Sequence, residues 1–155
     1  MNYQIAQINV ARMIGVNIDD PIMKEFVDNL DKVNDLAESS DGFIWRLKDE
    51  SNNASNFDPF NDEQVIINIS VWEDVASLEH FTYKTFHTDF LKRRKEWFKR
   101  YGQAHFALWW IEEGKYPTIE EAVERLGYLQ QNGATSHAFT FKDRFGKPDG
   151  LESKS

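Results

Sequence analysis

Polar side chains recur at intervals of seven within one run of the chain, residues 79–100 (EHFTYKTFHTDFLKRRKEWFKR), as His80, His87 and Arg94. Seven residues carry an α-helix through nearly two turns, so on a helix His87 and Arg94 share one face. An imidazole can change its charge near neutral pH, and a guanidinium holds a carboxylate, an enolate or a phosphate with paired N–H donors. The spacing therefore predicts a catalytic pair, in which His87 moves a proton and Arg94 stabilises negative charge.

Both residues of this pair also have structural explanations. His87 could be a core histidine that is hydrogen-bonded to a neighbour. Arg94 could form a salt bridge with Asp89 or Glu96. The other basic residues between positions 92 and 100 are expected on a solvated surface near a helix C-terminus, where the macrodipole favours cations. A non-catalytic explanation of the pair therefore stays open.

Five more side chains are predicted to contact a ligand. His80 and Tyr83 extend the polar line, provided that no helix break near Thr85 rotates them away. Three tryptophans could form an aromatic wall, because indole rings bury a large area and shape ligand cavities. These tryptophans are Trp45, Trp97 and Trp109. Core packing is the alternative, and we expect it for at least one of the three.

The sequence offers little support for a bound metal or cofactor. On a continuous helix, His80 and His87 would lie about 10 Å apart, too far for two ligands at about 2 Å from one ion. There is no HExxH, no phosphate-binding GxGxxG or GxxxxGK[ST], and no GxSxG. We therefore predict no metal and no cofactor. A haem held by one axial histidine is the remaining alternative.

Composition limits the class of protein. The chain has 155 residues, 41% of them hydrophobic, with a formal net charge of -8 and no cysteine. This length fits one domain with its own core, and the absence of cysteine removes disulfides and thiolate chemistry. The negative charge disfavours a nucleic-acid partner. Neither a leader peptide nor a membrane-length apolar run is present, so we expect a cytoplasmic protein without a membrane partner.

Apolar periodicity predicts alternating strands and helices. Strands are expected at residues 3–13, 43–48, 64–72, 105–111 and 137–142. Helices are expected at residues 22–37, 75–101 and 119–131. Thr118 and Glu121 have the spacing of a capping box for the last helix, and Gly133 is its expected terminator.

The order of these elements predicts an α+β fold. Its first part, βαββαβ, is the order of a ferredoxin-like antiparallel sheet with two helices on one face, extended here by a C-terminal helix and strand. We expect one domain over residues 1–145 and a flexible tail over residues 146–155. The polar loop Asp49–Glu63 is long enough to be a lid. Some strands are apolar on both sides, so a second copy is predicted to cover the open face as a homodimer.

Several motifs in this order carry a family resemblance. They are SVWED (70–74), HFTYKTFH (80–87), RKEWF (94–98), LWWIEEGKYPT (108–118), EAVERLGYL (121–129) and HAFTF (137–141). Together they resemble a bacterial family catalogued as a domain of unknown function, family 3291. That family belongs to the dimeric α/β barrel superfamily, which includes antibiotic-biosynthesis monooxygenases. The resemblance implies a dimeric α/β barrel, and it implies no particular catalytic residue.

Three classes of function follow as expectations. The first is a cofactor-independent enzyme, of monooxygenase or proton-transfer isomerase or cyclase type. Its substrate would be a small aromatic or enolisable metabolite in a pocket between sheet and helices. The second is a non-catalytic ligand-binding or dimerisation module. The third is a haem-binding protein.

Overall fold

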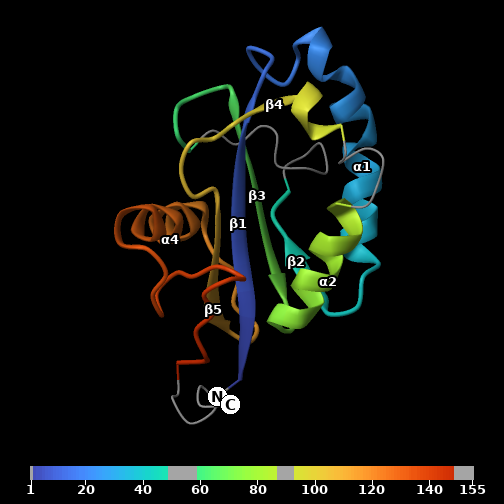
Figure 1. The fold of residues 1–155 in the computed structure, drawn as a ribbon. Coiled ribbons are helices and arrows are strands. Elements are labelled where there is room, and N and C mark those ends of the chain that lie inside the picture. The colour runs from blue at the N-terminus through green and yellow to red at the C-terminus, as the bar shows by residue number, and fades with distance from the viewer. Residues whose placement is uncertain (1, 49–58, 87–92, 149–155) are drawn as a thin grey trace.

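A computed structural model describes residues 2–48, 59–86 and 93–148 of the chain. Its strands are β1 (Tyr3–Met13), β2 (Phe43–Arg46), β3 (Val65–Trp72), β4 (Phe98–Lys99) and β5 (Phe106–Glu112). Its helices are α1 (Lys24–Glu38), α2 (Val75–Phe86) and α4 (Ile119–Asn132), with one-turn 3₁₀ helices η1 (Pro21–Met23) and η2 (Arg94–Glu96). The strands form one antiparallel sheet in the order β2-β3-β1-β4, and β5 also pairs with β1 (Figure 1). The predicted α+β fold is confirmed.

The central strand β1 has two different faces. Its alternate residues point to opposite sides of the sheet. One set is apolar and buried, and comprises Ala6, Ile8 and Val10. The other set mixes apolar and polar side chains, and comprises Ile5, Gln7 and Asn9. The polar side chains in the second set become important for the site below.

Helices α1 and α2 cover the mixed face of the sheet. Ala37 of α1 and Leu78 of α2 pack in one buried cluster with Trp72 of β3. The chain enters this layer through Asp20, whose carboxylate accepts hydrogen bonds from the N–H groups of Val16 (3.0 Å) and Ile22 (3.1 Å). These two donors stabilise the carboxylate and lower its pKa. Pro21 follows at the first helical position, where its missing N–H costs nothing.

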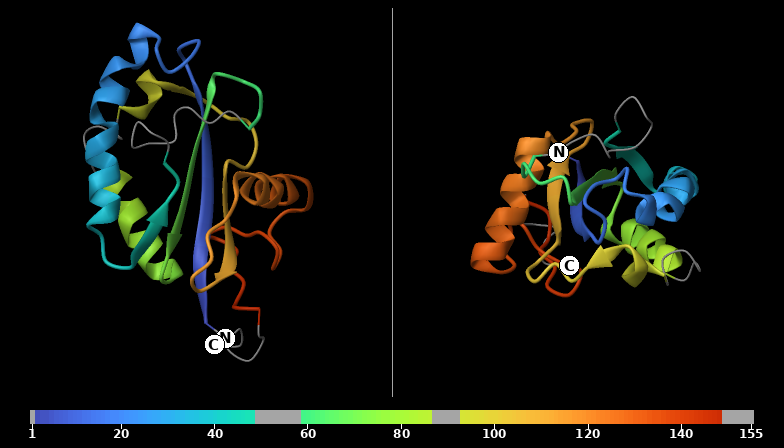
Figure 2. Two further views of the ribbon diagram at one scale, coloured as in Figure 1. Left: turned by 180° about the vertical axis from the view of Figure 1, so that it is seen from behind. Right: turned by 90° about the horizontal axis from the view of Figure 1, so that it is seen from above.

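Helix α4 covers the opposite, apolar face (Figure 2). Thr118 caps it by accepting a hydrogen bond from Glu121 N at 3.1 Å, and Gly133 ends it with a φ of 75°, as the sequence predicted. Ala122, Leu126 and Leu129 face the sheet and are buried. The face that was expected to need a second copy is therefore covered within the chain, and the homodimer stays a prediction.

Two predicted elements are wrong. The helix expected at residues 75–101 ends at Phe86, and the described chain resumes with η2 and β4. The physical reason is long-range pairing, since Phe98 pairs with Met13 of β1, and Ile14 N donates to Trp97 O at 2.6 Å. The strand expected at residues 137–142 is reduced to a single bridge between Phe139 and Leu108 of β5.

The ends of the other elements agree closely with the prediction, apart from β2, which stops at Arg46. The lid proposed for residues 49–63 lies largely outside the described residues, as does most of the expected tail at 146–155. Among the described helices, none combines the length and the apolar composition needed to cross a bilayer.

Candidate functional site

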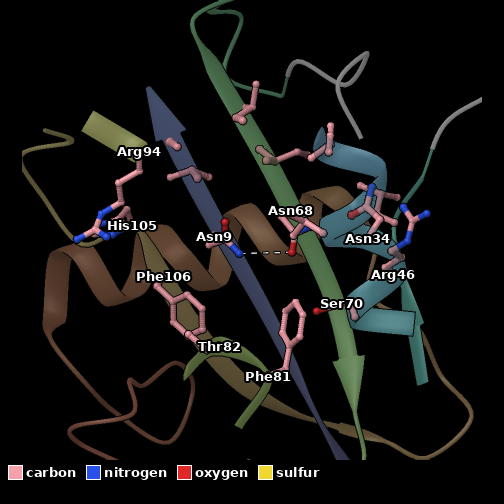
Figure 3. A pocket seen from close by; sticks show the side chains of 18 of the residues that line it. Asn9, Asn34, Arg46, Asn68, Ser70, Phe81, Thr82, Arg94, His105 and Phe106 are labelled. Carbon is pink, nitrogen blue, oxygen red and sulfur yellow. Dashed lines mark hydrogen bonds between the residues drawn. The ribbon is translucent and has the colours of Figure 1, made fainter. Parts of the chain in front are cut away.

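A cavity of about 750 Å³ lies between the mixed face of the sheet and helices α1 and α2 (Figure 3). Its apolar walls include Leu30, Val33, Ala37, Phe43, Ile66, Trp72, Phe81, Phe106 and Phe141. Its polar lining residues are Asn9, Asn34, Arg46, Asn68, Ser70, Thr82, Arg94, His105, Thr140 and Lys142. An apolar chamber of this size with a few converging polar groups is typical of a small-molecule site.

A row of hydrogen-bonded polar side chains crosses the floor of the cavity. The register of β1 on β3 sets Gln7 opposite Ser70 and Asn9 opposite Asn68. Gln7 Nε2 donates to Asn68 Oδ1 and to Ser70 Oγ, each at 2.7 Å. Asn9 Nδ2 donates to Gln7 Oε1 at 3.0 Å and to Asn68 Oδ1 at 3.3 Å. Within this row, Gln7 is buried and does not line the cavity, but its hydrogen bonds fix the amides of Asn9 and Asn68, which do.

Replacing Gln7 with Leu should lower the free energy of unfolding by about 1–3 kcal/mol, because buried polar partners would lose their hydrogen bonds. Gln4 on the same strand is the matched control. It is also buried, but its side-chain oxygen has no hydrogen-bond partner among the described residues. Gln4→Leu should therefore be nearly neutral or stabilising. Urea unfolding measures both, and equal losses would contradict a structural role for the row.

Aromatic rings form part of the cavity wall. Trp72 stacks on Phe81 with a centroid distance of 5.0 Å, and Phe43 meets Trp72 edge-on at 5.4 Å. Trp72 Nε1 donates to Ser70 Oγ at 2.9 Å, which joins these rings to the polar row. Phe106 and Phe141 form a second pair at 5.2 Å. A planar ligand would find apolar ring surfaces here.

The α1 side of the cavity carries a polar pair. Arg46 is 5% exposed, and its Nε donates to Glu38 Oε2 at 2.7 Å. Asn34 is also 5% exposed, and its Nδ2 is buried without a hydrogen-bond partner in the described part of the chain. An unsatisfied buried amide costs stability, so a native structure that keeps one needs an explanation such as a bound ligand.

The turn that carries Arg94 is held against α1 by its neighbour. Arg93 donates to Glu25 of α1 at 2.6 Å and to both carboxylate oxygens of Glu96, at 2.8 and 2.9 Å. These contacts raise the pKa of Arg93 and lower the pKa of Glu96. Arg94 itself is exposed and lines the cavity.

The predicted catalytic pair is only half placed. Arg94 lines the cavity from η2, whereas His87 lies outside the described residues, so its role stays a prediction. His80 and Tyr83 are exposed on α2, and neither lines the cavity. His80 and Arg94, which are fourteen residues apart, do not lie on one helix, because His80 is on α2 and Arg94 is on the separate turn η2.

The three predicted tryptophans lie in three different places, and none lines the cavity. Trp45 stacks on Tyr116 at 5.1 Å, and Trp97 is buried beside Phe26. Trp109 is fully buried beneath α4 on the other face of the sheet, because it pairs with Ala6 of the apolar set. Trp72 and the polar row were not predicted from the sequence. The available signal was polar side chains inside otherwise apolar strands.

No group of three or more potential ligands among His, Asp and Glu could hold a metal ion within residues 2–48, 59–86 and 93–148. The predicted absence of cofactors is not tested by this observation.

Comparison with known proteins decides the family. The model of a family described as a domain of unknown function (DUF3291) matches residues 4–155. The chain belongs to this family. The DUF3291 match covers both helical layers and all of the sheet except Tyr3, so the cavity lies inside the family's domain. A search of curated proteins found no match.

Among solved structures, the DUF3291 chain is similar to SnoaB, a cofactor-independent oxygenase from Streptomyces nogalater. The TM-score is 0.42 and the sequence identity 13%, and the match covers 75% of this chain and 96% of that one. A likeness of this size transfers neither activity nor residue roles to the DUF3291 chain.

Proposed function

We propose that the protein binds a small, partly aromatic molecule in the cavity between the sheet and helices α1 and α2. The observation that carries this proposal is the buried Asn34 amide without a partner, in a chamber of about 750 Å³ with apolar walls. Apolar walls supply affinity, and a few fixed polar groups supply orientation. Asn9 and Asn68 already have fixed positions, because their amides are hydrogen-bonded to Gln7 and to each other.

Within this proposal, the preferred class is a cofactor-independent enzyme of monooxygenase or proton-transfer type. Arg94 would stabilise negative charge on an enolate, and His87 would move the proton, as the sequence predicts. The superfamily of dimeric α/β barrels and the homodimer are part of the same proposal, and light scattering of the purified protein tests the dimer. A non-catalytic binding or dimerisation module is the alternative, and a haem-binding protein is the third.

Filling the cavity should abolish binding. Val33 lines it from α1, so a larger side chain at this position would occupy the chamber without altering the backbone. Lys32 is exposed on the same helix, so Lys32→Trp is the matched control. Small aromatic compounds that raise the melting temperature of the unmodified protein should also stabilise Lys32→Trp. They should not change the melting temperature of Val33→Trp.

The measurement is a thermal-shift screen followed by calorimetric titration of the compounds that bind. Circular dichroism first establishes that Val33→Trp is folded. A folded Val33→Trp that keeps full affinity would place the binding site elsewhere. Incubation of bound compounds in air, followed by mass spectrometry, separates the classes. A converted compound supports the enzyme, an unchanged one supports the binding module, and a Soret band after haem addition supports the third class.

A further inference from the structure

We propose that the ligand of this cavity is an aromatic oxyanion, such as a carboxylate or an enolate. Its charged group would lie at the end formed by Arg94, His105 and Lys142. This inference rests on the proposed function and narrows it to a chemical class.

The first observation is the sign of the charges in the cavity. The chain has 26 acidic and 18 basic residues, so a random sample of its ionisable groups would contain more acids than bases. The described lining residues show the reverse, since they include Arg46, Arg94, His105 and Lys142 but no Asp or Glu. Arginine and lysine side chains in the cavity wall attract anions locally, whereas the net negative charge of the chain repels them elsewhere on its surface.

The second observation is that Arg46 lies apart from the other basic lining residues, which are Arg94, His105 and Lys142. The bridge between Leu108 and Phe139 is antiparallel. Two residues away on each side, the rings of Phe106 and Phe141 have a centroid distance of 5.2 Å. His105 directly precedes Phe106 and Lys142 directly follows Phe141 in the chain, so both basic residues adjoin this ring pair. Figure 3 shows Arg94 and His105 at one end of the cavity, and Asn34 and Arg46 at the other.

The cationic end directly adjoins aromatic surface. Phe106 and Phe141 follow His105 and precede Lys142 in the chain, and both rings line the cavity. A ligand whose ring packs on this pair would have its oxyanion within reach of long basic side chains. At the opposite end, Arg46 pairs with Glu38 at 2.7 Å, so a carboxylate already lies beside the guanidinium there.

The opposite end calls for a neutral acceptor. The donor that is left without a partner there is Asn34 Nδ2, whose side chain is 5% exposed. A carbonyl or hydroxyl oxygen of the ligand would satisfy it. The ligand therefore has an oxyanion at one end, aromatic rings in the middle and an uncharged oxygen at the other end.

The test compares acids with their uncharged amides of nearly equal shape: benzoate with benzamide, salicylate with salicylamide, and cinnamate with cinnamamide. Calorimetric titration at neutral pH should show each acid binding about tenfold more tightly than its amide, because charge-assisted hydrogen bonds are the stronger ones. In Arg94→Gln/Lys142→Gln this preference should disappear. The control is Lys24→Gln/Lys115→Gln, which removes two exposed positive charges away from the cavity and should keep the preference.

Amides that bind as tightly as acids would overturn the anionic ligand while leaving the binding site intact. Failure of both series to bind would overturn the proposed function as well. A preference that persists in Arg94→Gln/Lys142→Gln would overturn the assignment to these cations. If that variant does not fold, salt gives a second measurement on the unmodified protein. Raising NaCl from about 20 mM to about 500 mM should weaken only the acids, and equal weakening of both series would contradict the inference.

Discussion

Leu126→Ala should lower the free energy of unfolding by about 3 kcal/mol, within the range measured for leucine truncation in other cores. Leu126 is 1% exposed at the centre of the buried face of α4. It packs in the same apolar cluster as Ile8 of β1, Ile69 of β3 and Trp109 of β5. Removing three carbons there leaves a cavity that these rigid strand residues cannot fill.

Urea unfolding followed by circular dichroism measures this loss, and Gln131→Ala on the exposed side of α4 is its control. A loss below about 0.5 kcal/mol for Leu126→Ala would mean that α4 is not what covers the apolar face. Leu126→Asp extends the experiment, because a buried carboxylate should detach α4 and expose the sheet. Light scattering should then show assemblies larger than those of the unmodified protein, whereas an unchanged size would contradict this account of the apolar face.

Gly42→Ala should lower the free energy of unfolding at least as much. Gly42 has a φ of 84°, a conformation that side chains other than glycine rarely adopt, and it joins α1 to β2. A Cβ at this position would overlap Ser77 of α2, so the two helical elements would have to separate. Glu73 N also donates to Gly42 O at 2.7 Å, which ties the turn to the start of α2. We expect a loss of about 3 kcal/mol or more.

Gly114→Ala separates the two causes of this loss. Gly114 has a nearly equal φ of 87°, but a Cβ there would meet no atom within 4 Å. It should therefore report backbone strain alone, at about 1 kcal/mol. Gly42 lies in the turn between α1 and β2 and contacts Ser77 of α2. A shift of α2 would change the cavity, so Gly42→Ala should also weaken ligand binding, whereas Gly114→Ala should not. Equal losses of stability for the two variants would contradict the steric contact with Ser77.

Local patterns in the sequence were sufficient where local physics decides the structure. Alternation predicted β1 and β3 closely, because their apolar faces are buried along their whole length. Thr118 and Gly133 predicted both ends of α4, since capping depends only on residues within one turn. The family resemblance was confirmed by the match to the DUF3291 model.

Long-range pairing was what the sequence could not show. Trp97 and Phe98 have helical spacing from earlier apolar residues, yet they are held by contacts with β1 and α1. Periodicity cannot distinguish a buried helical stripe from a short strand and turn that bury the same side chains. Trp109 was assigned to a ligand wall for a related reason, because the face it occupies depends on the register of β5 on β1.

The polar row shows the same limit at the site. Gln7 and Ser70 are 63 positions apart, and each alone is an ordinary polar residue in an apolar strand. Only the register of β1 and β3 places them opposite each other and turns four polar side chains into one network. The cavity also needs α1 and α2 on the same face of the sheet, which the order of elements predicted. It needs side chains short enough to leave a chamber between these helices and the sheet, which the order of elements did not predict.

The central place of β1 has a consequence for the order in which the protein folds. Its partners are made much later, since Ile5 pairs with Trp72 on one side and with Trp110 on the other. During synthesis, at about 5–20 residues per second, the backbone of β1 stays unpaired for several seconds until β3 is made, and for longer until β5 is made. The hairpin-like contact of β2 with β3 can form meanwhile, because those strands are closer in the chain. The first strand to be made is thus the last to gain both neighbours. The polar row on the cavity floor needs only β1 and β3, so it can form before Phe106 of β5 completes the cavity wall.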